Sequence, residues 1–345
     1  MSEPVFLKEF TPPELELWAR QGGQPDYRAR QLLKWLYSQN AEDFQVMTDL
    51  SKDFRRWLAE NACISSVKRQ KILTDVDGTR KLLLRLHDGA AIESVLIDEG
   101  DRLTLCLSSQ VGCAYGCRFC LTGRDGFRRN LTAGEIVDQI CAARKELAVG
   151  ERLTNLVFMG MGEPLANLEQ VLRALEIITS DHGLNFSTRK ITLSTVGLIP
   201  EMLKLSSLFP IKLAVSLHAP DNETRSRIMP INRRYPLEEL LKACRSLELP
   251  RRNRITFEYL LLGGFNDSPQ AARELAKLLR GLRAKINLIP FNQYPGAEFK
   301  APSSISVEEF QKILQDEHFT VTVRQSRGAG IMAACGQLSR WRSLL

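Results

Sequence analysis

Three closely spaced cysteines are the feature that most restricts the fold and chemistry of this 345-residue chain. The run Cys-Ala-Tyr-Gly-Cys-Arg-Phe-Cys places thiols at Cys113, Cys117 and Cys120. Gly112 and Gly116 let the backbone fold tightly enough for the three thiols to face one centre. Structural zinc sites and ordinary iron–sulfur clusters use four protein ligands. Three thiolates therefore predict a [4Fe–4S] cluster with one open iron, and the alternative is a zinc site with a distant fourth ligand.

The composition is that of a soluble chain with a large core. Hydrophobic residues make up 44% and charged residues 25% of the sequence, as in ordinary globular proteins. No apolar run is long enough to predict a membrane span, and the acidic start does not resemble a signal peptide. We expect a cytoplasmic protein with reduced thiols and no membrane contact. The net charge of +7 indicates a polyanionic partner.

The hydrophobic pattern divides the chain into four parts. Residues 1–62 have helical spacing and predict an accessory domain, either a plain small bundle or an RNA-binding unit. Residues 63–102 predict a β-meander, with turns marked by Asp-Gly pairs. Residues 103–300 alternate strand and helix in six βα units, which predicts an α/β fold with a partial, open (βα)6 barrel. Residues 301–345 predict a helix beginning at Ser306, a strand and a cysteine loop.

Small polar residues follow several of the predicted barrel strands, at the edge where the cysteine loop leaves the first strand. Gly162 and Glu163 end the second strand, where a glycine allows close approach and a carboxylate can pair with an ammonium group. The later strands end in Ser194, in Ser216, Leu217 and His218, and in Asn292. Each could be a helix cap, but together they suit ribose hydroxyls and adenine edges. For the histidine, a pocket wall is favoured over iron ligation.

A separate cysteine, Cys335, lies in the run Ala-Ala-Cys-Gly-Gln-Leu near the C-terminus. Free cysteines are often buried packing residues, which is one interpretation. The glycine-rich approach, Arg-Gly-Ala-Gly at residues 327–330, favours a mobile functional loop equally. The sequence of this region leaves both interpretations open.

The cysteine spacing, with an aromatic residue before the last cysteine, resembles the signature of the radical S-adenosylmethionine (SAM) superfamily. Over nearly the whole chain the sequence resembles the RlmN-type adenine-C2 RNA methyltransferases. The motifs that carry this resemblance are Ile-Glu-Ser-Val, Leu-Cys-Leu-Ser-Ser-Gln-Val-Gly-Cys, Gly-Met-Gly-Glu-Pro-Leu, Ser-Leu-His-Ala-Pro, Met-Pro-Ile-Asn and Ala-Ala-Cys-Gly-Gln-Leu. The resemblance implies a [4Fe–4S] cluster on the three clustered cysteines. It also implies SAM bound by Gly162, Glu163, Ser194, Ser216, Leu217, His218 and Asn292.

The resemblance further implies a mechanism that uses three residues outside the cluster loop. Cys335 would carry a methyl group, Cys106 would resolve the protein–RNA adduct through a disulfide, and Glu93 would transfer a proton. The implied substrate is one adenosine in the peptidyl-transferase region of 23S rRNA, and for some members an adenosine beside the anticodon of tRNA. We expect a monomer that receives electrons from flavodoxin or ferredoxin.

Two alternatives and one departure from the family pattern remain. A Cfr-like enzyme would methylate adenine C8 with the same cysteines, and a non-catalytic iron–sulfur RNA-binding or sensing protein would need only the cluster. Met332 follows Ile331, and residues 328–330 lack the aspartates usual in the family, which leaves the anchoring of the Cys335 loop open.

Arginines expected to contact RNA phosphates are Arg128, Arg129, Arg233, Arg234, Arg251, Arg252, Arg254, Arg340 and Arg342.

Overall fold

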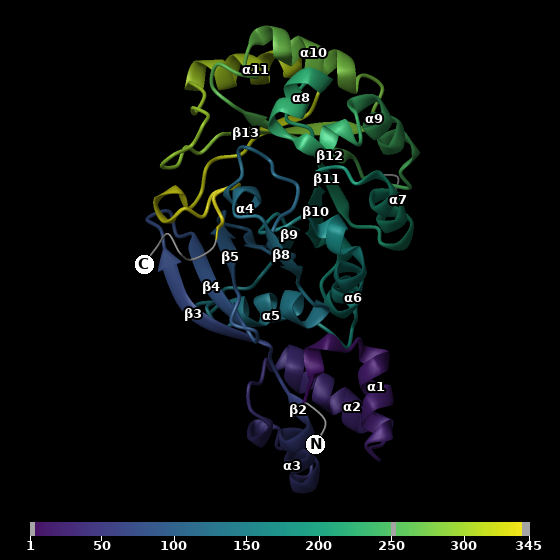
Figure 1. The fold of residues 1–345 in the computed structure, drawn as a ribbon. Helices are drawn as coiled ribbons and strands as arrows, with labels where there is room; N and C mark the ends of the chain where they lie inside the picture. The colour runs from purple at the N-terminus through teal and green to yellow at the C-terminus, as the bar shows by residue number, and fades with distance from the viewer. Residues whose placement is uncertain (1–3, 250–252, 340–345) are drawn as a thin grey trace.

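The computed structural model describes residues 4–249 and 253–339 and contains one long mixed sheet (Figure 1). In these residues ten strands are ordered β14-β13-β12-β11-β10-β9-β6-β5-β4-β3, so β14 and β3 form open edges. No helix within the described ranges has the length and apolar character needed to cross a membrane. Of the arginines named above, Arg251, Arg252, Arg340 and Arg342 lie outside the described residues.

Seven strands of this sheet run parallel and form the barrel wall. They are β6 (Leu103–Cys106), β9 (Asn155–Phe158), β10 (Ile191–Thr195), β11 (Lys212–Ser216), β12 (Ile255–Leu261), β13 (Ala284–Pro290) and β14 (Val321–Val323). Most of their apolar side chains are buried, as expected for strands covered by helices, whereas Val157 and the two valines of β14 are partly exposed. The α/β class and the open barrel are confirmed. The short β14 adds a seventh parallel strand to the six expected βα units.

Helices connect successive parallel strands on the outside of the sheet. They are α5 (Ala133–Arg144), α6 (Leu168–Thr179), α7 (Ile199–Leu208), α8 (Asn222–Ile228), α9 (Leu237–Ser246), α10 (Pro269–Leu279) and α11 (Ser304–Asp316). Thr132 and Glu135 form a capping box at the start of α5. The expected start of the last helix at Ser306 is wrong, because Ser303 is the N-cap and its hydroxyl accepts a hydrogen bond from Ser306 N at 3.0 Å.

The predicted meander consists of β3 (Val67–Thr74), β4 (Arg80–Leu86) and β5 (Ala91–Asp98). These strands pair antiparallel, and β5 pairs antiparallel with β6. The meander is therefore continuous with the barrel sheet. Figure 1 shows the yellow C-terminal segment lying over the ends of β3 and β4, close to the short helix α4 (Leu121–Arg124).

The N-terminal region is mainly helical, with α1 (Pro12–Gln21), α2 (Asp26–Leu33), a π-helical turn at Lys34–Ser38 and α3 (Lys52–Asn61). Two short parallel strands, β1 (Val5–Phe6) and β2 (Ala62–Cys63), join its two ends. The region contacts α5 through a buried ion pair between Lys8 Nζ and Asp138 Oδ1 at 2.6 Å. The exact boundaries expected for the four parts of the chain stay a prediction.

Candidate active site

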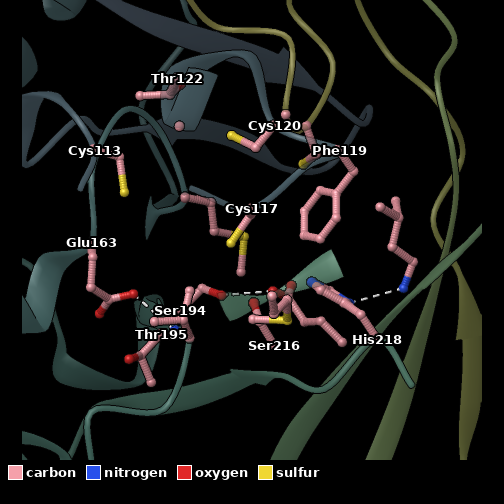
Figure 2. A pocket seen from close by; sticks show the side chains of 18 of the residues that line it. Cys113, Cys117, Phe119, Cys120, Thr122, Glu163, Ser194, Thr195, Ser216 and His218 are labelled. Carbon is pink, nitrogen blue, oxygen red and sulfur yellow. Dashed lines mark hydrogen bonds between the residues drawn. The ribbon is translucent and has the colours of Figure 1, made fainter. Parts of the chain in front are cut away.

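A cavity at the carboxyl ends of the barrel strands contains the predicted cluster cysteines. It is open to solvent, and the empty space within it and at its mouth amounts to about 880 Å³. Figure 2 shows Cys113, Cys117 and Cys120 on one side, and Ser194, Thr195, Ser216 and His218 on the other. Residues far apart in the sequence thus line one space, at the edge of the sheet where parallel α/β folds bind ligands.

The cysteine loop is held by local contacts. It begins after β7 (Gln110–Gly112), which pairs with β8 (Phe127–Asn130) on the far side of the loop. Gly112 has a φ of 82°, and a Cβ there would lie 1.8 Å from Gly126 O. Only glycine fits this position, because the two backbone segments approach so closely. Within the loop, Cys120 N donates to Cys117 O at 3.0 Å.

The environment of the three thiols fits a cluster with several metal ions. Burial raises the pKa of Cys113 to about 12 and also raises the pKa values of Cys117 and Cys120, with the neighbouring cysteines adding to the shift. Thiolates in such a place need a compensating positive charge, which iron ions supply. Within the described ranges, no three His, Cys, Asp or Glu side chains gather as ligands of a single metal ion. A [4Fe–4S] cluster does not need such convergence, since each thiolate binds a different iron.

Glu163 lies at the Cys113 side of the cavity (Figure 2), in the loop after β9 and at the N-cap of the short 3-10 helix Pro164–Asn167. Leu165 N donates to its Oε1 at 3.0 Å, and Val196 N donates to Oε2 at 2.8 Å. Burial nevertheless raises the pKa of Glu163 to about 7. An ammonium group beside this carboxylate would favour its charged form, so the site fits the amino group of SAM. The preceding Gly162 has a φ of 98°, and a Cβ there would lie 2.5 Å from Gln110 Cβ.

The opposite side of the cavity presents hydroxyls and one carboxylate. Ser194 Oγ donates to Glu258 Oε2 at 2.6 Å. The other oxygen of Glu258 is buried and has no hydrogen-bond partner among the described residues. Ser216 also lines this side. These groups leave donor and acceptor sites available to a polar ligand such as a ribose.

His218 forms a neutral wall of the cavity. Its Nδ1 accepts a hydrogen bond from Leu260 N at 3.0 Å, and its ring contacts Phe119 edge-on at 5.0 Å. Burial, helped by the nearby Arg225 cation, lowers the pKa of His218 to about 3. The ring is therefore uncharged at neutral pH, with one nitrogen already occupied.

Two predicted SAM contacts lie outside this cavity lining. The Leu217 side chain is fully buried in the core between two lining residues. Asn292 lies in a smaller adjoining cavity, where its Oδ1 contacts Ser326 Oγ and its backbone oxygen accepts from Gln337 Nε2 at 3.3 Å. Asn292 therefore supports the C-terminal segment in this structure rather than the main cavity.

Cys335 lines both the main cavity and the adjoining one, from a segment that crosses the cluster loop. Leu121 N donates to Gly336 O at 2.8 Å, so α4 holds this segment beside the cysteine loop. Cys106 ends β6 and is buried nearby. Burial and the neighbouring Cys335 raise the pKa of Cys106 to about 12. The fold thus brings together two cysteines that are 229 positions apart by their numbering, 106 and 335.

Glu93 lies on β5, beneath the same segment. Its Oε1 is 3.1 Å from Lys81 Nζ, and its Oε2 accepts from Ser339 N at 3.1 Å. Both side chains of the ion pair are at most 3% exposed. Burial raises the pKa of Glu93, although Lys81 acts against this shift. A buried carboxyl group whose pKa is raised accepts a proton more readily than an exposed one.

Sequence reasoning missed several residues of the site. Arg225 is fully buried and donates to the backbone oxygens of Val196, Ser216 and Leu217, so it holds two strand-end loops together. Arg324 follows β14, where attraction to Cys335 raises its pKa. The position of Glu258 in the predicted strand β12 could have indicated that its side chain faces the cavity, because side chains alternate between the two faces of a strand. No local sequence pattern indicates that Arg225 is buried or that Arg324 is partly buried.

The predicted RNA-contacting arginines differ in their availability. Arg129 is bound between Asp88 and Glu135, with N–O distances of 2.8 and 2.7 Å. Both carboxylates already pair with this guanidinium, and its expected contact with RNA phosphates stays a prediction. Four of the other predicted arginines are exposed, namely Arg128, Arg233, Arg234 and Arg254.

The fold and the cavity define a radical SAM protein, and comparisons with known proteins agree. Residues 107–276 match the profile of the Radical SAM superfamily. Residues 5–64 match the Ribosomal RNA large subunit methyltransferase N-terminal domain. A crystal structure of a radical SAM methyltransferase from Sphaerobacter thermophilus is 48% identical, with a TM-score of 0.94, and the match covers 97% of this chain and 99% of that one.

Two similar relatives define the family more closely. The dual-specificity RNA methyltransferase RlmN of Syntrophobacter fumaroxidans is 53% identical, over 97% of this chain and 98% of its own length. The enzyme of the same name from Geotalea uraniireducens is also 53% identical, over 97% of each chain. The chain belongs to the RlmN-type radical SAM RNA methyltransferases, which use a [4Fe–4S] cluster and SAM.

Proposed function

We propose that this chain methylates C2 of a specific adenosine in 23S rRNA, and of the adenosine beside the anticodon in tRNAs, with Cys335 as the methyl carrier. The observation that carries the proposal is the position of Cys335 in the wall of the cavity that also contains the three clustered cysteines. Close relatives named as dual-specificity RNA methyltransferases support both RNA classes. C2 is an electron-poor carbon, so direct displacement of a SAM methyl group by it is unfavourable.

The residues that would hold the cofactors follow from the cavity. Cys113, Cys117 and Cys120 would bind the cluster, and Glu163 would bind the SAM ammonium group. Ser194 and Ser216, opposite the thiols, suit the SAM ribose. When bound, the cluster and SAM together supply a carbon radical that removes hydrogen, and SAM also supplies the methyl group.

The chain's own residues carry the later steps. The Cys335 thiolate attacks the SAM methyl carbon; a sulfur–carbon bond forms, the sulfonium bond breaks, and S-adenosylhomocysteine leaves. Joining the carbon to C2 leaves one unpaired electron, which an electron acceptor takes up while Glu93 accepts the C2 proton. The Cys106 thiolate then attacks the Cys335 sulfur and forms a disulfide. The sulfur–carbon bond breaks, and the released methylene carbon keeps its electron pair and takes up a proton to become the methyl group of the base. A cellular dithiol then reduces this disulfide, which returns Cys106 and Cys335 to their thiol forms.

The other partners are part of the same proposal. We place RNA binding on residues 1–62, together with the exposed Arg128 and Arg233 on the barrel. The target base would leave its stack to reach the cavity. We expect a monomer that is reduced by flavodoxin or ferredoxin. The eight cysteines are free, and thiolate ligands persist in a reducing compartment, which favours the cytoplasm.

Mass spectrometry of the nucleosides from 23S rRNA and tRNA after reaction tests the function. We expect 2-methyladenosine in both RNAs. Formation of 8-methyladenosine would instead establish the Cfr-like reaction. If reduced, cluster-loaded enzyme formed no 5′-deoxyadenosine from SAM and left both RNAs unchanged, the non-catalytic alternative would replace the proposal.

A further inference from the structure

We propose that Asp75 and Asp77, at the tip of the β3–β4 hairpin, are positioning residues that hold the Cys335 segment over the active-site cavity. They would act on the reaction through the backbone of residues 328–332, without touching substrate or cofactor. This inference rests on the proposed role of Cys335 as methyl carrier. It assigns a function to a hairpin that the mechanism above does not use.

The first observation is a pair of long-range hydrogen bonds. Gly328 N donates to Asp77 Oδ2 at 2.9 Å, across 251 positions of sequence. Gly330 N donates to Asp75 Oδ2 at 3.0 Å, across 255 positions. Both bonds join a carboxylate of the hairpin to the backbone just before Cys335. Hydrogen bonds to a charged group are stronger than those between neutral groups.

The second observation is the close approach of the two segments. A Cβ at Gly330 would lie 2.7 Å from Asp75 Oδ1. A Cβ at Gly328 would lie 2.8 Å from Thr79 Cγ2 and 2.7 Å from Ala333 Cβ, and Gly328 also has a φ of 69°. Glycine at both positions lets the backbone reach the hairpin. The contact therefore depends on the shape of both segments, and not only on two polar side chains.

The hairpin tip presents its carboxylates in fixed positions. Asp77 Oδ1 accepts from Thr79 N at 2.9 Å, and Asp75 Oδ1 accepts from Val76 N at 2.8 Å. Asp75 N also donates to Thr79 O at 2.8 Å, which closes the turn. In each aspartate one oxygen fixes the turn, and the other binds the C-terminal segment. Partial burial acts to raise the pKa of Asp77, but hydrogen bonds from Gly328 and Thr79 outweigh it and lower this pKa, so the carboxylate is charged at neutral pH.

A third contact from the same hairpin lies nearer to the cysteine. Lys81, at the start of β4, donates from Nζ to Met332 O at 3.2 Å. Met332 has a φ of 51°, a left-handed conformation that costs energy for a residue with a side chain. The backbone keeps this conformation three residues before Cys335 because contacts on both sides hold it. The hairpin thus fixes the segment up to the turn that leads into the cysteine.

The segment is held at its other end by the cluster loop. Thr122 Oγ1 donates to Leu338 O at 2.6 Å, and Leu121 N donates to Gly336 O at 2.8 Å. Cys335 therefore lies between two attachments, the hairpin before it and α4 after it. Loss of the hairpin attachment would leave the segment tethered but free to shift. Misplacement by about 1 Å can slow a reaction by about 10²-fold.

The two carboxylates also account for the departure from the family pattern. The loop itself lacks the usual aspartates at residues 328–330. The structure provides two carboxylates from the opposite side, on the hairpin. The small residues in the loop and the acidic residues in the hairpin form one complementary contact, which explains how this particular loop is anchored.

The experiment compares Asp75→Ala and Asp77→Ala with the matched control Asp98→Ala, in full-length protein. Asp98 caps the β5–β6 turn of the same sheet, where it accepts from Gly100 N at 2.9 Å, and among the described residues no hydrogen bond or ion pair joins its side chain to the Cys335 segment. Hydrogen exchange of the cofactor-free protein is the first readout. We expect faster exchange in peptides covering residues 328–338 of both hairpin variants and no change there in the control.

The second readout is methylation of Cys335 by labelled SAM in the cluster-loaded enzyme, followed by peptide mass spectrometry. We expect it to slow at least about tenfold in each hairpin variant, the loss expected for one hydrogen bond to a charged group. Iron content and the affinity for SAM should stay at the wild-type level. A merely structural role would lower those two quantities as well.

Two further variants test the contact between the hairpin and the Cys335 segment, one by steric hindrance and one by removal of charge. Gly330→Ala places a methyl group against Asp75 without altering the hairpin, and it should reproduce the effect of Asp75→Ala. In the double variant Asp75→Ala/Gly330→Ala, Cys335 methylation should slow by less than the two single changes together would predict, because the alanine at position 75 leaves room for the added methyl group. Asp77→Asn keeps an acceptor without its charge and should fall between wild type and Asp77→Ala.

The outcomes separate this inference from the proposed function. Unchanged exchange at residues 328–338, or wild-type Cys335 methylation in both hairpin variants, would overturn the positioning role. If wild-type enzyme itself never methylated Cys335, the proposed function would fail first. Slower methylation with faster local exchange and normal iron content would support both.

Discussion

The two cysteine-bearing segments of the active site, residues 113–120 and the segment around Cys335, are held in different ways. The first is held mainly by contacts close to it in sequence: Cys120 N donates to Cys117 O, and Cys113 N donates to Gly126 O at 3.2 Å, while Arg118 N also donates to the distant Ile228 O at 3.0 Å. The second is fixed mainly by partners between 215 and 255 positions away in sequence, from the Leu121 N–Gly336 O bond to the Gly330 N–Asp75 Oδ2 bond. A site that keeps its cofactor permanently can be built from one loop, whereas a carrier cysteine needs attachments that the whole fold supplies.

The largest expected effect comes from substitutions in the first segment, residues 113–120. Alanine at Cys113, Cys117 or Cys120 should abolish cluster binding and SAM cleavage together, because two thiolates do not hold the [4Fe–4S] cluster. Iron analysis and 5′-deoxyadenosine measurements check this. Cys244→Ala, a buried cysteine outside the cavity, is the matched control and should keep its iron. Normal iron content in the triple variant, or zinc alone at the site, would refute the assignment.

The next prediction separates the two cysteines that lie outside the cluster. Cys106→Ala should still receive the methyl group on Cys335 and then accumulate a covalent protein–RNA adduct, because no thiol remains to release the base. Cys335→Ala should bind the cluster and SAM but form neither adduct nor product. Denaturing gel electrophoresis with labelled RNA detects the adduct. Clean turnover by Cys106→Ala would show that it does not resolve the adduct.

A smaller effect concerns the buried ion pair beneath the Cys335 segment. Lys81→Met should lower the free energy of unfolding by about 3–5 kcal/mol, since Glu93 would then be a buried, unpaired carboxylate. The double variant Lys81→Met/Glu93→Gln should recover much of this stability, because no charge remains. Urea unfolding of the cofactor-free proteins measures both values. Equal stability of the wild type and the single variant would contradict the pairing.

The smallest effect is a pH dependence due to Glu163. Its pKa rises from 4.5 to about 7 on folding, so the folded state binds this proton more tightly than the unfolded state. The contribution of Glu163 to the free energy of unfolding is therefore fully present below pH 4.5, and it is lost as the pH rises to about 7. Between pH 4.5 and 8 the free energy of unfolding of the wild type should fall by roughly 3 kcal/mol because of Glu163. The Glu163→Gln variant should lack this part of the fall, because glutamine does not titrate. Matching pH profiles of the two cofactor-free proteins in urea would contradict the raised pKa.

The comparison of the two segments also shows what the sequence could predict. The cysteine loop and the strand-end residues Glu163, Ser194 and Ser216 follow from local spacing and from strand–helix alternation, so they could be placed without a structure. Leu217 stays a predicted SAM contact, although its side chain is fully buried outside the cavity lining. The contacts of Asp75 and Asp77 could not be predicted, since their partners lie about 250 positions away. No local pattern marks such a pair.

The account depends most directly on the source of the methyl carbon. Enzyme whose Cys335 has been methylated with ¹³C-labelled SAM is freed of that SAM, supplied with unlabelled SAM and a reductant, and allowed one turnover on RNA. We predict that the methyladenosine from this first turnover carries ¹³C, because its carbon comes from the protein. Unlabelled methyladenosine from the first turnover, with the label still on Cys335, would contradict the central role of this residue.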